Sequence, residues 1–409
     1  MASRVRYLST GIMDTAFESQ VLPVLVAAHQ SQFDLIHISF DPFRREITER
    51  YREKWKKLDS MGIKTLYFKQ MPPFAPSFLA IDVKRILSAF RVWREENKRV
   101  VIHARGHLNA YRGLILKKRF PEQIRLIADL RGAVSDEVCQ GPAPFTKYLF
   151  SQYLRKFYQR IEHQVVHQAD AILCVSNVFK EYLQTTYGVQ QITVIPTFVD
   201  TSRFKFSQLS REVFRKKLGL SDRIVFVYSG GIAPWQRIEN IIQLFIHLRR
   251  ELDNLFMLFL SPEPSVIEHL VGDQIRREDM QVIRVPHHEV GGYLCAADVG
   301  ILLREKILTN RVAAPIKFSE YMCCGLPCIL SEEIGDTAEV IRKEKAGIVL
   351  DGSREAPKSP EFQKLLVLNR EEISNRMSKK YASSLYIPEI LKLYRTLAEK
   401  RPPFSLDAC

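Results

Sequence analysis

The feature of this sequence that most constrains its fold is an alternation between short apolar runs and longer amphipathic stretches. The short runs are rich in β-branched residues and indicate strands, while the stretches between them have helical spacing. Strands that alternate with helices and are apolar throughout indicate parallel sheets that helices cover on both faces. The expected strands are Phe33–Ser39, Thr65–Phe68, Arg99–His103, Ile124–Leu130, Ala171–Val175, Ile192–Ile195, Ile224–Ser229, Leu255–Leu260, Met280–Val285, Val299–Leu303, Cys328–Ser331 and Gly347–Leu350.

The alternation runs to about residue 199 and starts again near residue 222, and the segment between, Asp200–Asp222, is polar and poor in strands. A chain of 409 residues is long enough for about two domains. We therefore predict an α/β fold with two Rossmann-like domains, residues 1–199 and 200–370, followed by C-terminal helices over residues 371–409. Pro388 interrupts the last helical pattern, so we expect a bend or a restart at that residue.

The cysteine pattern favours a cytoplasmic protein with reduced thiols. The seven cysteines form no C-x-x-C pair and no zinc-type spacing, and Cys323 and Cys324 are adjacent. No apolar run reaches the ~18–20 residues of a membrane-spanning helix, and the start of the sequence lacks the apolar core of a signal peptide.

The net charge of +14 is concentrated in the first half of the chain. Residues 1–199 hold 29 Lys and Arg against 18 Asp and Glu, a net +11, and residues 200–409 hold the remaining +3. Basic runs such as Lys54–Lys57, Arg91–Arg94 and Lys117–Arg119 are each typical of a solvated helix face. Together they indicate an anionic partner, either the inner surface of a membrane or a phosphate-bearing substrate. No nucleic-acid-binding motif accompanies them, so we expect no nucleic acid partner.

A pair of glycines follows the expected strand Ile224–Ser229, where ligands of open α/β sheets bind. Gly230 and Gly231 open a loop that runs to Arg237, and a helical pattern then continues through Arg249. Glycines let a phosphate approach the backbone closely, and a helix start offers unpaired N–H groups to an anion. A tight left-handed turn explains the same glycines equally well.

The stretch NRVAAPIKFSEYMCCGLPCI, residues 310–329, predicts a second helix start beside that loop. Pro315 is suited to the first helical turn and Gly325 to the helix end. Pro315 and Ile316 present close-packed backbone, and Lys317 adds a full charge for a diphosphate. The carboxylate of Glu320 suits a ribose diol. Alternatively, Glu320 only favours the positive helix end, an effect worth ~0.3–1 kcal/mol.

PIKFSEYMCCGLPCI resembles the donor-site helix of family-4 glycosyltransferases of the GT-B fold, in which two Rossmann-like domains face each other across a cleft. The likeness extends over most of the chain. CVSN at residues 174–177 followed by IPTFVD at 195–200 is similar to the family's passage into the second domain, and ADVG at 297–300 resembles a strand motif of the family. IADLRG at 127–132 with Asp136 and Glu137 resembles the D-x-R-G … D-E signature of one bacterial branch.

This resemblance implies a retaining transfer from a nucleotide-diphosphate sugar, in which Glu320 binds the ribose and the last helix crosses back to the first domain. The family often has a glutamate eight residues before the ribose glutamate, where this chain has Val312. The usual cations of the first phosphate loop are displaced too, so the charge of the diphosphate falls to Arg237, Lys317 and the two helix starts. By position after neighbouring strands, Ser261 borders the sugar, and Pro286 and His287 border the base.

The first domain is expected to bind the acceptor. His103, Asp129 and Arg131 lie at the ends of expected strands, so we predict that they orient the acceptor and screen charge as catalytic residues. A satisfied core histidine and a local ion pair are equally consistent with these residues. The sequence has no D-x-D pair for a divalent ion, so we expect no metal and no cofactor beyond the substrate, a nucleotide sugar of UDP or GDP type.

We therefore expect a cytoplasmic hexosyltransferase of bacterial surface polysaccharide synthesis that acts on a glycan or lipid-linked acceptor and contacts an anionic membrane peripherally. Two alternatives stay open: a sugar-nucleotide epimerase and a catalytically silent GT-B scaffold. A basic, acceptor-recruiting first half speaks against the epimerase, whereas Val312 favours the scaffold. Release of free nucleotide in the presence of an acceptor would distinguish a transferase from both.

Overall fold

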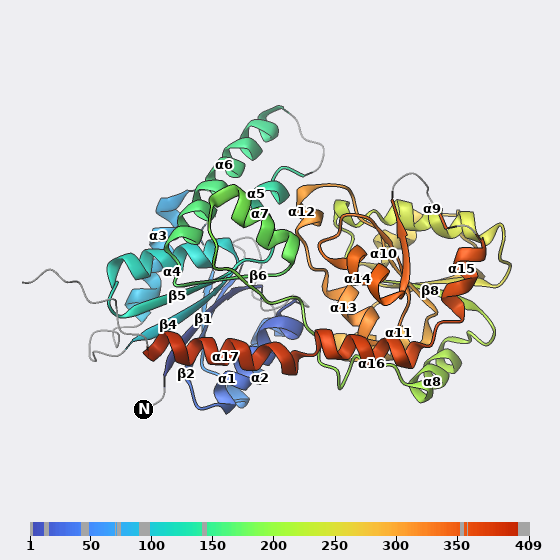
Figure 1. Cartoon of the computed structure of the whole chain (residues 1–409), viewed down its shortest axis with the longest axis horizontal. Helices are drawn as coiled ribbons and strands as arrows, with labels where there is room; N and C mark the ends of the chain where they lie inside the picture. Colours follow the sequence, from blue (N-terminus) through green and yellow to red (C-terminus); the bar gives the residue numbers. More distant parts are fainter. Residues whose placement is uncertain are drawn as a thin grey trace, which may run out of the picture. The chain divides into compact units, whose positions relative to one another are not determined.

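The computed structural model describes residues 3–11, 16–41, 49–69, 71, 75–89, 99–140, 145–351, 356–357 and 359–399 (Figure 1). The chain divides into two compact units. The first unit contains the residues up to Val175, Lys180–Ile195 and the chain from Tyr386 onward, and the second contains Ser176–Phe179 and Pro196–Leu385. The expected basic run Arg91–Arg94 lies outside the described residues.

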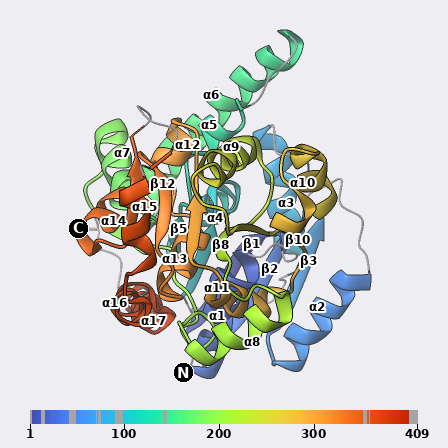
Figure 2. The same ribbon diagram turned by 90° about the vertical axis from the view of Figure 1, so that its right-hand side faces the viewer.

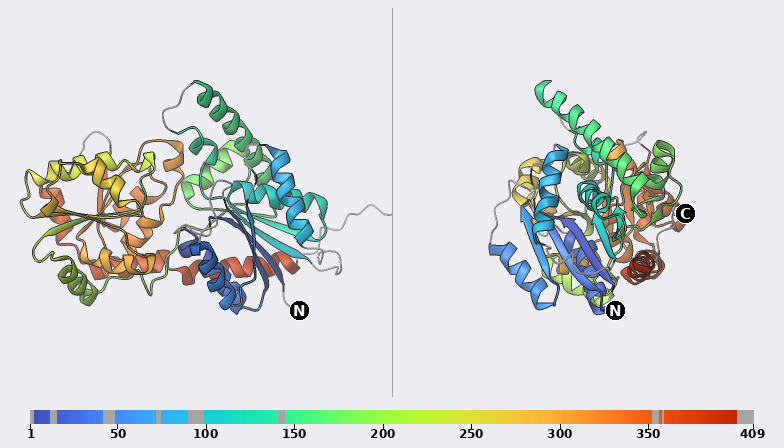
Figure 3. Two further views of the ribbon diagram at one scale, coloured as in Figure 1. Left: turned by 180° about the vertical axis from the view of Figure 1, so that it is seen from behind. Right: turned by 90° about the vertical axis from the view of Figure 1, so that its left-hand side faces the viewer.

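The first unit is built on a parallel sheet with the strand order β3-β2-β1-β4-β5-β6-β7. Helices lie on both faces of this sheet, with α1, α2 and α17 on one side and α3, α4 and α6 on the other (Figures 1 and 3). Its strands are β1 (Arg4–Thr10), β2 (Asp34–Asp41), β3 (Thr65–Lys69), β4 (Val100–Arg105), β5 (Ile124–Asp129), β6 (Ala171–Cys174) and β7 (Thr193–Val194). Its helices are η1 (Phe17–Val21), α1 (Leu22–Gln30), α2 (Glu49–Ser60), α3 (Pro76–Ala89), α4 (His107–Arg119), α5 (Val134–Glu137), α6 (Phe145–Gln168), most of α7 (Asn177–Tyr187) and most of α17 (Ser383–Glu399).

The apolar-run pattern misses strand β1, although β1 lies inside the sheet between β2 and β4. Its sequence places arginines among the apolar residues, and Arg6 is nevertheless buried. The Arg6 guanidinium donates to the backbone oxygen of Asp34 at 2.7 Å and to its carboxylate at 3.2 Å. Because the neighbouring strand supplies this partner, an arginine can occupy a strand position that the sequence pattern treats as polar.

The second unit contains a parallel sheet with the order β10-β9-β8-β11-β12-β13, and the order reverses between β8 and β11. Successive residues of β8 enter two different cores, Val225 and Val227 on one face and Phe226 and Tyr228 on the other, as in a sheet covered on both faces. The strands are β8 (Ile224–Ser229), β9 (Leu255–Leu260), β10 (Met280–Ile283), β11 (Val299–Leu302), β12 (Cys328–Ser331) and β13 (Gly347–Leu350). The helices are α8 (Gln208–Leu218), η3 (Pro234–Gln236), α9 (Ile238–Arg249), α10 (Pro264–Val271), η4 (Arg277–Asp279), η5 (His287–Glu289), α11 (Val290–Ala296), α12 (Leu308–Arg311), α13 (Ile316–Cys323), α14 (Thr337–Glu344), α15 (Ser359–Leu366) and α16 (Arg370–Tyr381).

These sheets confirm the predicted α/β class, and the expected strands are present with ends shifted by up to two residues. A restart at Pro388 is wrong, because the last helical stretch is interrupted at Ala382 and α17 continues through Pro388. Ala382 is extended and forms a β-bridge with Val199. Val199 forms backbone hydrogen bonds with the residues on either side of Ala382. Its N–H donates to the carbonyl of Tyr381 and its carbonyl accepts from the N–H of Ser383, each at 2.8 Å. Pro388, in the second turn, removes only one helical hydrogen bond.

Candidate functional site

The reversal of strand order in the second unit brings together the two loops that the sequence singles out. In open α/β sheets ligands bind at such a point, beyond the carboxyl ends of the strands. The glycine loop follows β8, and the chain into α13 follows β11, which is the neighbour of β8. Tyr321 of α13 connects the two, because its hydroxyl accepts a hydrogen bond from the backbone N–H of Ser229 at 2.7 Å.

Gly230 makes room for the side chain of Lys317. The backbone of Gly230 has a φ of +142°, and a Cβ atom at this position would lie 2.6 Å from Nζ of Lys317. Any other residue would therefore displace the ammonium group. The glycine is thus required by a close approach as well as by its backbone conformation.

Lys317 is a buried cation held by neutral partners. Its side chain is at the second position of α13, and the residue is only 8% exposed. Nζ lies 3.9 Å from the ring centroid of Tyr228 and donates to Oε1 of Gln236 at 3.0 Å. Burial and the positive charge of Arg304 lower the pKa of Lys317 well below its usual 10.5, and Glu320 opposes them. Within the described residues, no carboxylate forms a salt bridge with this ammonium.

The start of α13 adds hydrogen-bond donors to this positive charge. Pro315 occupies the N-cap position, one residue before the expected one, so the amides of Ile316 and Lys317 have no acceptor inside the helix. Arg304, two residues after the end of β11, was missed as a site residue, although its position after a strand could have identified it. Its backbone N–H bonds Ser331 and its guanidinium bonds Asn310. An anion at this helix start would meet two cations and two amides that have no acceptor within α13.

The structure brings two of the predicted donor residues, Glu320 and His287, into contact. Nε2 of His287 lies 3.0 Å from Oε1 of Glu320, and both side chains are nearly buried. His287 also packs against the ring of Phe204, with centroids 5.4 Å apart. Glu320 lies in the second turn of α13. It is therefore beyond the first turn, where a negative charge interacts most strongly with the helix dipole. The histidine therefore fixes one carboxylate oxygen, and none of the described residues donates a hydrogen bond to the other.

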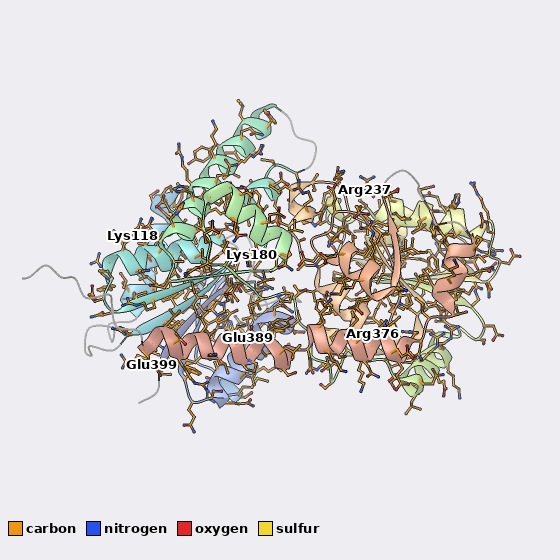
Figure 4. All side chains as sticks on the ribbon, viewed as in Figure 1. Lys118, Lys180, Arg237, Arg376, Glu389 and Glu399 are labelled. Atoms are coloured by element: carbon orange, nitrogen blue, oxygen red, sulfur yellow. The ribbon has the colours of Figure 1, made fainter. Side chains whose placement is uncertain are left out.

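The other predicted donor residues have local partners. The carbonyl of Gly231 accepts from the hydroxyl of Tyr228 at 2.5 Å, and the buried hydroxyl of Ser261 accepts from the N–H of Glu263 at 3.1 Å. Pro286 is the N-cap of the η5 turn. Arg237, which is labelled in Figure 4, is in the left-handed conformation at the start of α9. Its Nε donates to Asn240 of the same helix at 2.7 Å. Lys317 supplies a positive charge beside Gly230, with Arg304 acting on it, and the role of Arg237 at the diphosphate stays a prediction.

The CVSN and IPTFVD motifs hold the chain around α13 in place. Ser176 donates to the carbonyl of Val312 at 2.8 Å, and Asn177 donates twice to the carboxylate of Asp336. The carbonyl of Thr197 accepts from the hydroxyl of Ser319 in α13 at 2.8 Å. Val312 itself is buried, so the position of the expected acid belongs to the core of the second unit.

In the first unit the predicted residues His103, Asp129 and Arg131 form one cluster, together with Arg105. The Asp129 carboxylate accepts from Arg131 at 3.1 Å and from Arg105 at 3.2 Å, and Nε2 of His103 lies 3.5 Å away. Burial by itself would raise the pKa of Asp129, but Arg131, His103 and Arg105 outweigh it and hold this pKa well below its ordinary value. Asp129 is therefore a carboxylate at any physiological pH.

His103 is buried on the inner side of this cluster. Its Nδ1 lies 2.6 Å from the hydroxyl of Tyr394 in α17, and its ring lies 4.4 Å from that of Tyr7. Burial lowers the pKa of His103 despite the opposing effect of Asp129. Arg131 reaches further toward solvent, with its side chain 17% exposed. The arrangement fits the alternative of a satisfied core histidine, and a role for His103 in the reaction would run through Asp129. Nothing local in the sequence points to Tyr394 as its partner.

Two family models match the chain, and together they cover most of it. The model named Glycosyltransferase Family 4 matches residues 42–203, and the model named Glycosyl transferases group 1 matches residues 210–382. The chain belongs to the family-4 glycosyltransferases.

Solved structures show that this family-4 glycosyltransferase has the GT-B fold. The sucrose-phosphate synthase of Thermosynechococcus elongatus is similar with a TM-score of 0.72 and 15% identity, over 97% of this chain and 99% of that one. Anabaena HepE in complex with UDP and glucose has a TM-score of 0.68 and 12% identity, over 96% of this chain and 100% of that one.

Curated relatives match about half of the family-4 chain. A GDP-mannose-dependent alpha-(1-6)-phosphatidylinositol monomannoside mannosyltransferase of Mycolicibacterium smegmatis is 24% identical over 46% of this chain and 51% of its own. A Bacillus subtilis protein named as a teichuronic acid biosynthesis glycosyltransferase, TuaC, is 26% identical over 42% of this chain and 43% of its own. The chain spans about half the length of the curated relatives it matches. Among the described helices, none combines the length and the apolar character that crossing a bilayer requires.

Proposed function

We propose that this family-4 glycosyltransferase moves a sugar from a nucleotide-diphosphate sugar to a glycan or lipid-linked acceptor in bacterial surface polysaccharide synthesis. The observation that carries the proposal is Lys317, a buried ammonium without a carboxylate partner in the described chain, at a helix start beside Gly230. A diphosphate supplies the missing negative charge. One relative is named for GDP-mannose and HepE was solved with UDP, so both donor types are candidates.

The reaction needs stabilisation of the charge that develops on the leaving diphosphate. Lys317, Arg304 and the free amides of α13 are positioned cations and dipoles of the kind that provide it, which is why we propose that no divalent ion takes part. The acceptor hydroxyl oxygen bonds the anomeric carbon as the bond to the phosphate oxygen breaks. We propose that the leaving phosphate takes the hydroxyl proton on the same face, so that the configuration is retained and no protein nucleophile is required.

The first unit is proposed to bind the acceptor. Asp129 is a carboxylate fixed by Arg131 and Arg105, so it can accept a hydrogen bond from an acceptor hydroxyl, and Arg131 can bind an anionic acceptor group. His103 would act as a positioning residue through Asp129. The net charge of +11 over residues 1–199 supports peripheral contact with an anionic membrane, where a lipid-linked acceptor resides.

Thermal stabilisation by nucleotides tests this proposal. Because a ligand of the folded state raises the melting temperature, UDP or GDP should stabilise the protein and uridine or guanosine should not. Lys317→Ala removes a charged contact and should weaken nucleotide binding by about 30-fold. The exposed Lys343 in the same unit provides the matched control, Lys343→Ala, which should bind as the wild type does.

Equal binding by the Lys317→Ala variant, or no stabilisation by any nucleoside diphosphate or its sugars, contradicts the proposed donor site. Release of free nucleotide that requires an acceptor separates a transferase from an epimerase, which changes the sugar without net release. A scaffold protein would bind nucleotide sugar without either change.

A further inference from the structure

Helix α6 has two halves with different surroundings. From Phe157 onward it packs on the first unit, and Phe157, Tyr158, Ile161 and Val165 are buried. The preceding half projects beyond the rest of this unit in each view of the ribbon (Figures 1, 2 and 3). We call residues 148–153 of this half the α6 tip.

The α6 tip exposes large apolar side chains in an unusual concentration. Tyr148, Leu149, Phe150 and Tyr153 are 52%, 53%, 48% and 50% exposed. Three of them are consecutive, and since successive residues are about 100° apart on a helix, they point to different sides of it. A single flat protein face cannot cover all of them. A fluid apolar medium that surrounds the tip can.

The charges along α6 favour a negatively charged partner. Arg155, Lys156 and Arg160 are exposed in the turns that directly follow the tip. The first acidic residue of the helix is Glu162, which is buried and bonded to His107 and Tyr187. Tyrosine and phenylalanine next to basic residues are typical of segments that lie at a bilayer surface, with the aromatic groups inside the headgroup layer and the cations among the phosphates.

We propose that the α6 tip is a membrane-docking element that inserts into the surface of a bilayer rich in anionic phospholipids. The inference deepens the proposed function and rests on it, because a bilayer is where a lipid-linked acceptor resides. The order of the chain is consistent with this assignment, because the proposed acceptor residues Asp129 and Arg131 precede α5 and α6 in sequence. Docking by this helix would hold the acceptor-binding unit at the membrane without a spanning segment.

Sedimentation with vesicles tests the docking. The full chain should bind vesicles of phosphatidylglycerol and phosphatidylcholine in equal parts, and bind pure phosphatidylcholine vesicles weakly. Tyr148→Ser with Phe150→Ser removes apolar contact, and Arg155→Glu with Lys156→Glu reverses the charge. Each double variant should lower the vesicle partition coefficient by about tenfold or more at ~0.15 M ionic strength.

Matched controls distinguish the tip from general properties of the chain. Leu209→Ser with Val213→Ser removes exposed apolar residues of α8, which are 71% and 54% exposed. Lys343→Glu with Lys345→Glu makes the same charge change on exposed lysines of the second unit, outside the basic first half of the chain. Both controls should bind vesicles like the wild type.

Nucleotide stabilisation of each variant reports folding and the proposed donor site independently of lipid. If the wild type binds vesicles but no nucleotide, the proposed function is overturned and the docking proposal is not. The docking proposal would be overturned if the wild type and the tip variants bound vesicles equally. It would also be overturned if the wild type bound both types of vesicle equally. A wild-type dimer in light scattering that the tip variants convert to a monomer would overturn it as well, because a second copy would then cover the tip.

Discussion

Lys317 shows how one buried amine can make ligand binding depend on pH. Burial and the charge of Arg304 lower its pKa well below the usual 10.5. An anion binds the protonated amine better, so nucleotide binding takes up a proton whenever the pH exceeds this pKa. The dissociation constant for UDP or GDP should therefore rise with pH above that pKa, by about tenfold per unit.

Calorimetric titration over a pH series above about pH 7 checks this expectation, because the phosphate's own titration near pH 6 lies below that range. The Lys317→Ala variant lacks the amine, so its weaker affinity should lose this slope. A slope of equal size in both proteins would assign the pH dependence to another group.

The pair of Glu320 and His287 leads to a second prediction at the residue scale. If the free oxygen of Glu320 binds the ribose, the wild type should prefer a ribonucleotide over its 2′-deoxy form by about tenfold, a loss of one charge-assisted hydrogen bond. Glu320→Ala should bind both forms equally, whereas His287→Ala, which only loosens the carboxylate, should keep part of the preference. Competition binding with the two nucleotides measures the ratio. An unchanged preference in Glu320→Ala would remove Glu320 from the ribose site.

At the scale of elements, Arg370 connects the ends of two helices. Its guanidinium donates to the carbonyls of Leu294, Cys295 and Ala297 at the end of α11, and to those of Cys324 and Gly325 at the end of α13. Orphan carbonyls and the negative helix ends both favour a cation there. Burial lowers the pKa of Arg370 to about 10, so it stays charged at neutral pH.

Arg370→Ala should lower the free energy of unfolding by about 3 kcal/mol or more, because several buried carbonyls lose their partner at once. Urea denaturation measures the change. Arg376 lies on the same helix but is half-exposed, with its main partner in Glu344, so Arg376→Ala should change stability by about 0.5 kcal/mol or less. Similar losses in the two variants would contradict the capping role of Arg370.

Elements also show what the sequence could and could not predict. Apolar runs locate the strands because burial on both faces demands them, and Pro315 and Gly325 bound α13 through local backbone preferences. Gly325 has a φ of +64°, but a Cβ there would also lie 2.0 Å from the carbonyl oxygen of Arg370, a contact that local sequence does not reveal. Strand β1 was missed because the partner of Arg6 comes from another strand. The contacts of His287 with Glu320 and of His103 with Tyr394 are likewise tertiary contacts. Sequence patterns identified His287, Glu320 and His103 but could not show which residues they contact.

At the scale of the whole molecule, the two units carry different chemistry. The second unit contains the cations proposed for the diphosphate and the residues that support them. One of these, Ser176, belongs to a short segment of the second unit that lies in sequence between two parts of the first unit. The residues proposed for the acceptor lie in the first unit. Each ligand should therefore act on the stability of one unit.

The first unit should be the acid-sensitive one, because it buries neutral histidines. Burial lowers the pKa of His37 to about 3. The unfolded chain takes up a proton on this residue below about pH 6.5, whereas the folded protein does not, so stability is lost as the pH falls from 6.5 toward 3. At pH 5 this one group should cost the first unit about 2 kcal/mol.

Scanning calorimetry of the full chain can therefore assign the two unfolding transitions. Lowering the pH from 7 to 5 should shift the transition of the first unit downward, and His37→Asn should reduce this shift. At pH 7 a nucleoside diphosphate at 100 times its dissociation constant should raise only the transition of the second unit, by about 2.7 kcal/mol of stability. Because each unit has its own sheet and core, the two changes should fall on different transitions. A single transition that responds to both acid and nucleotide would show instead that the two units unfold as one.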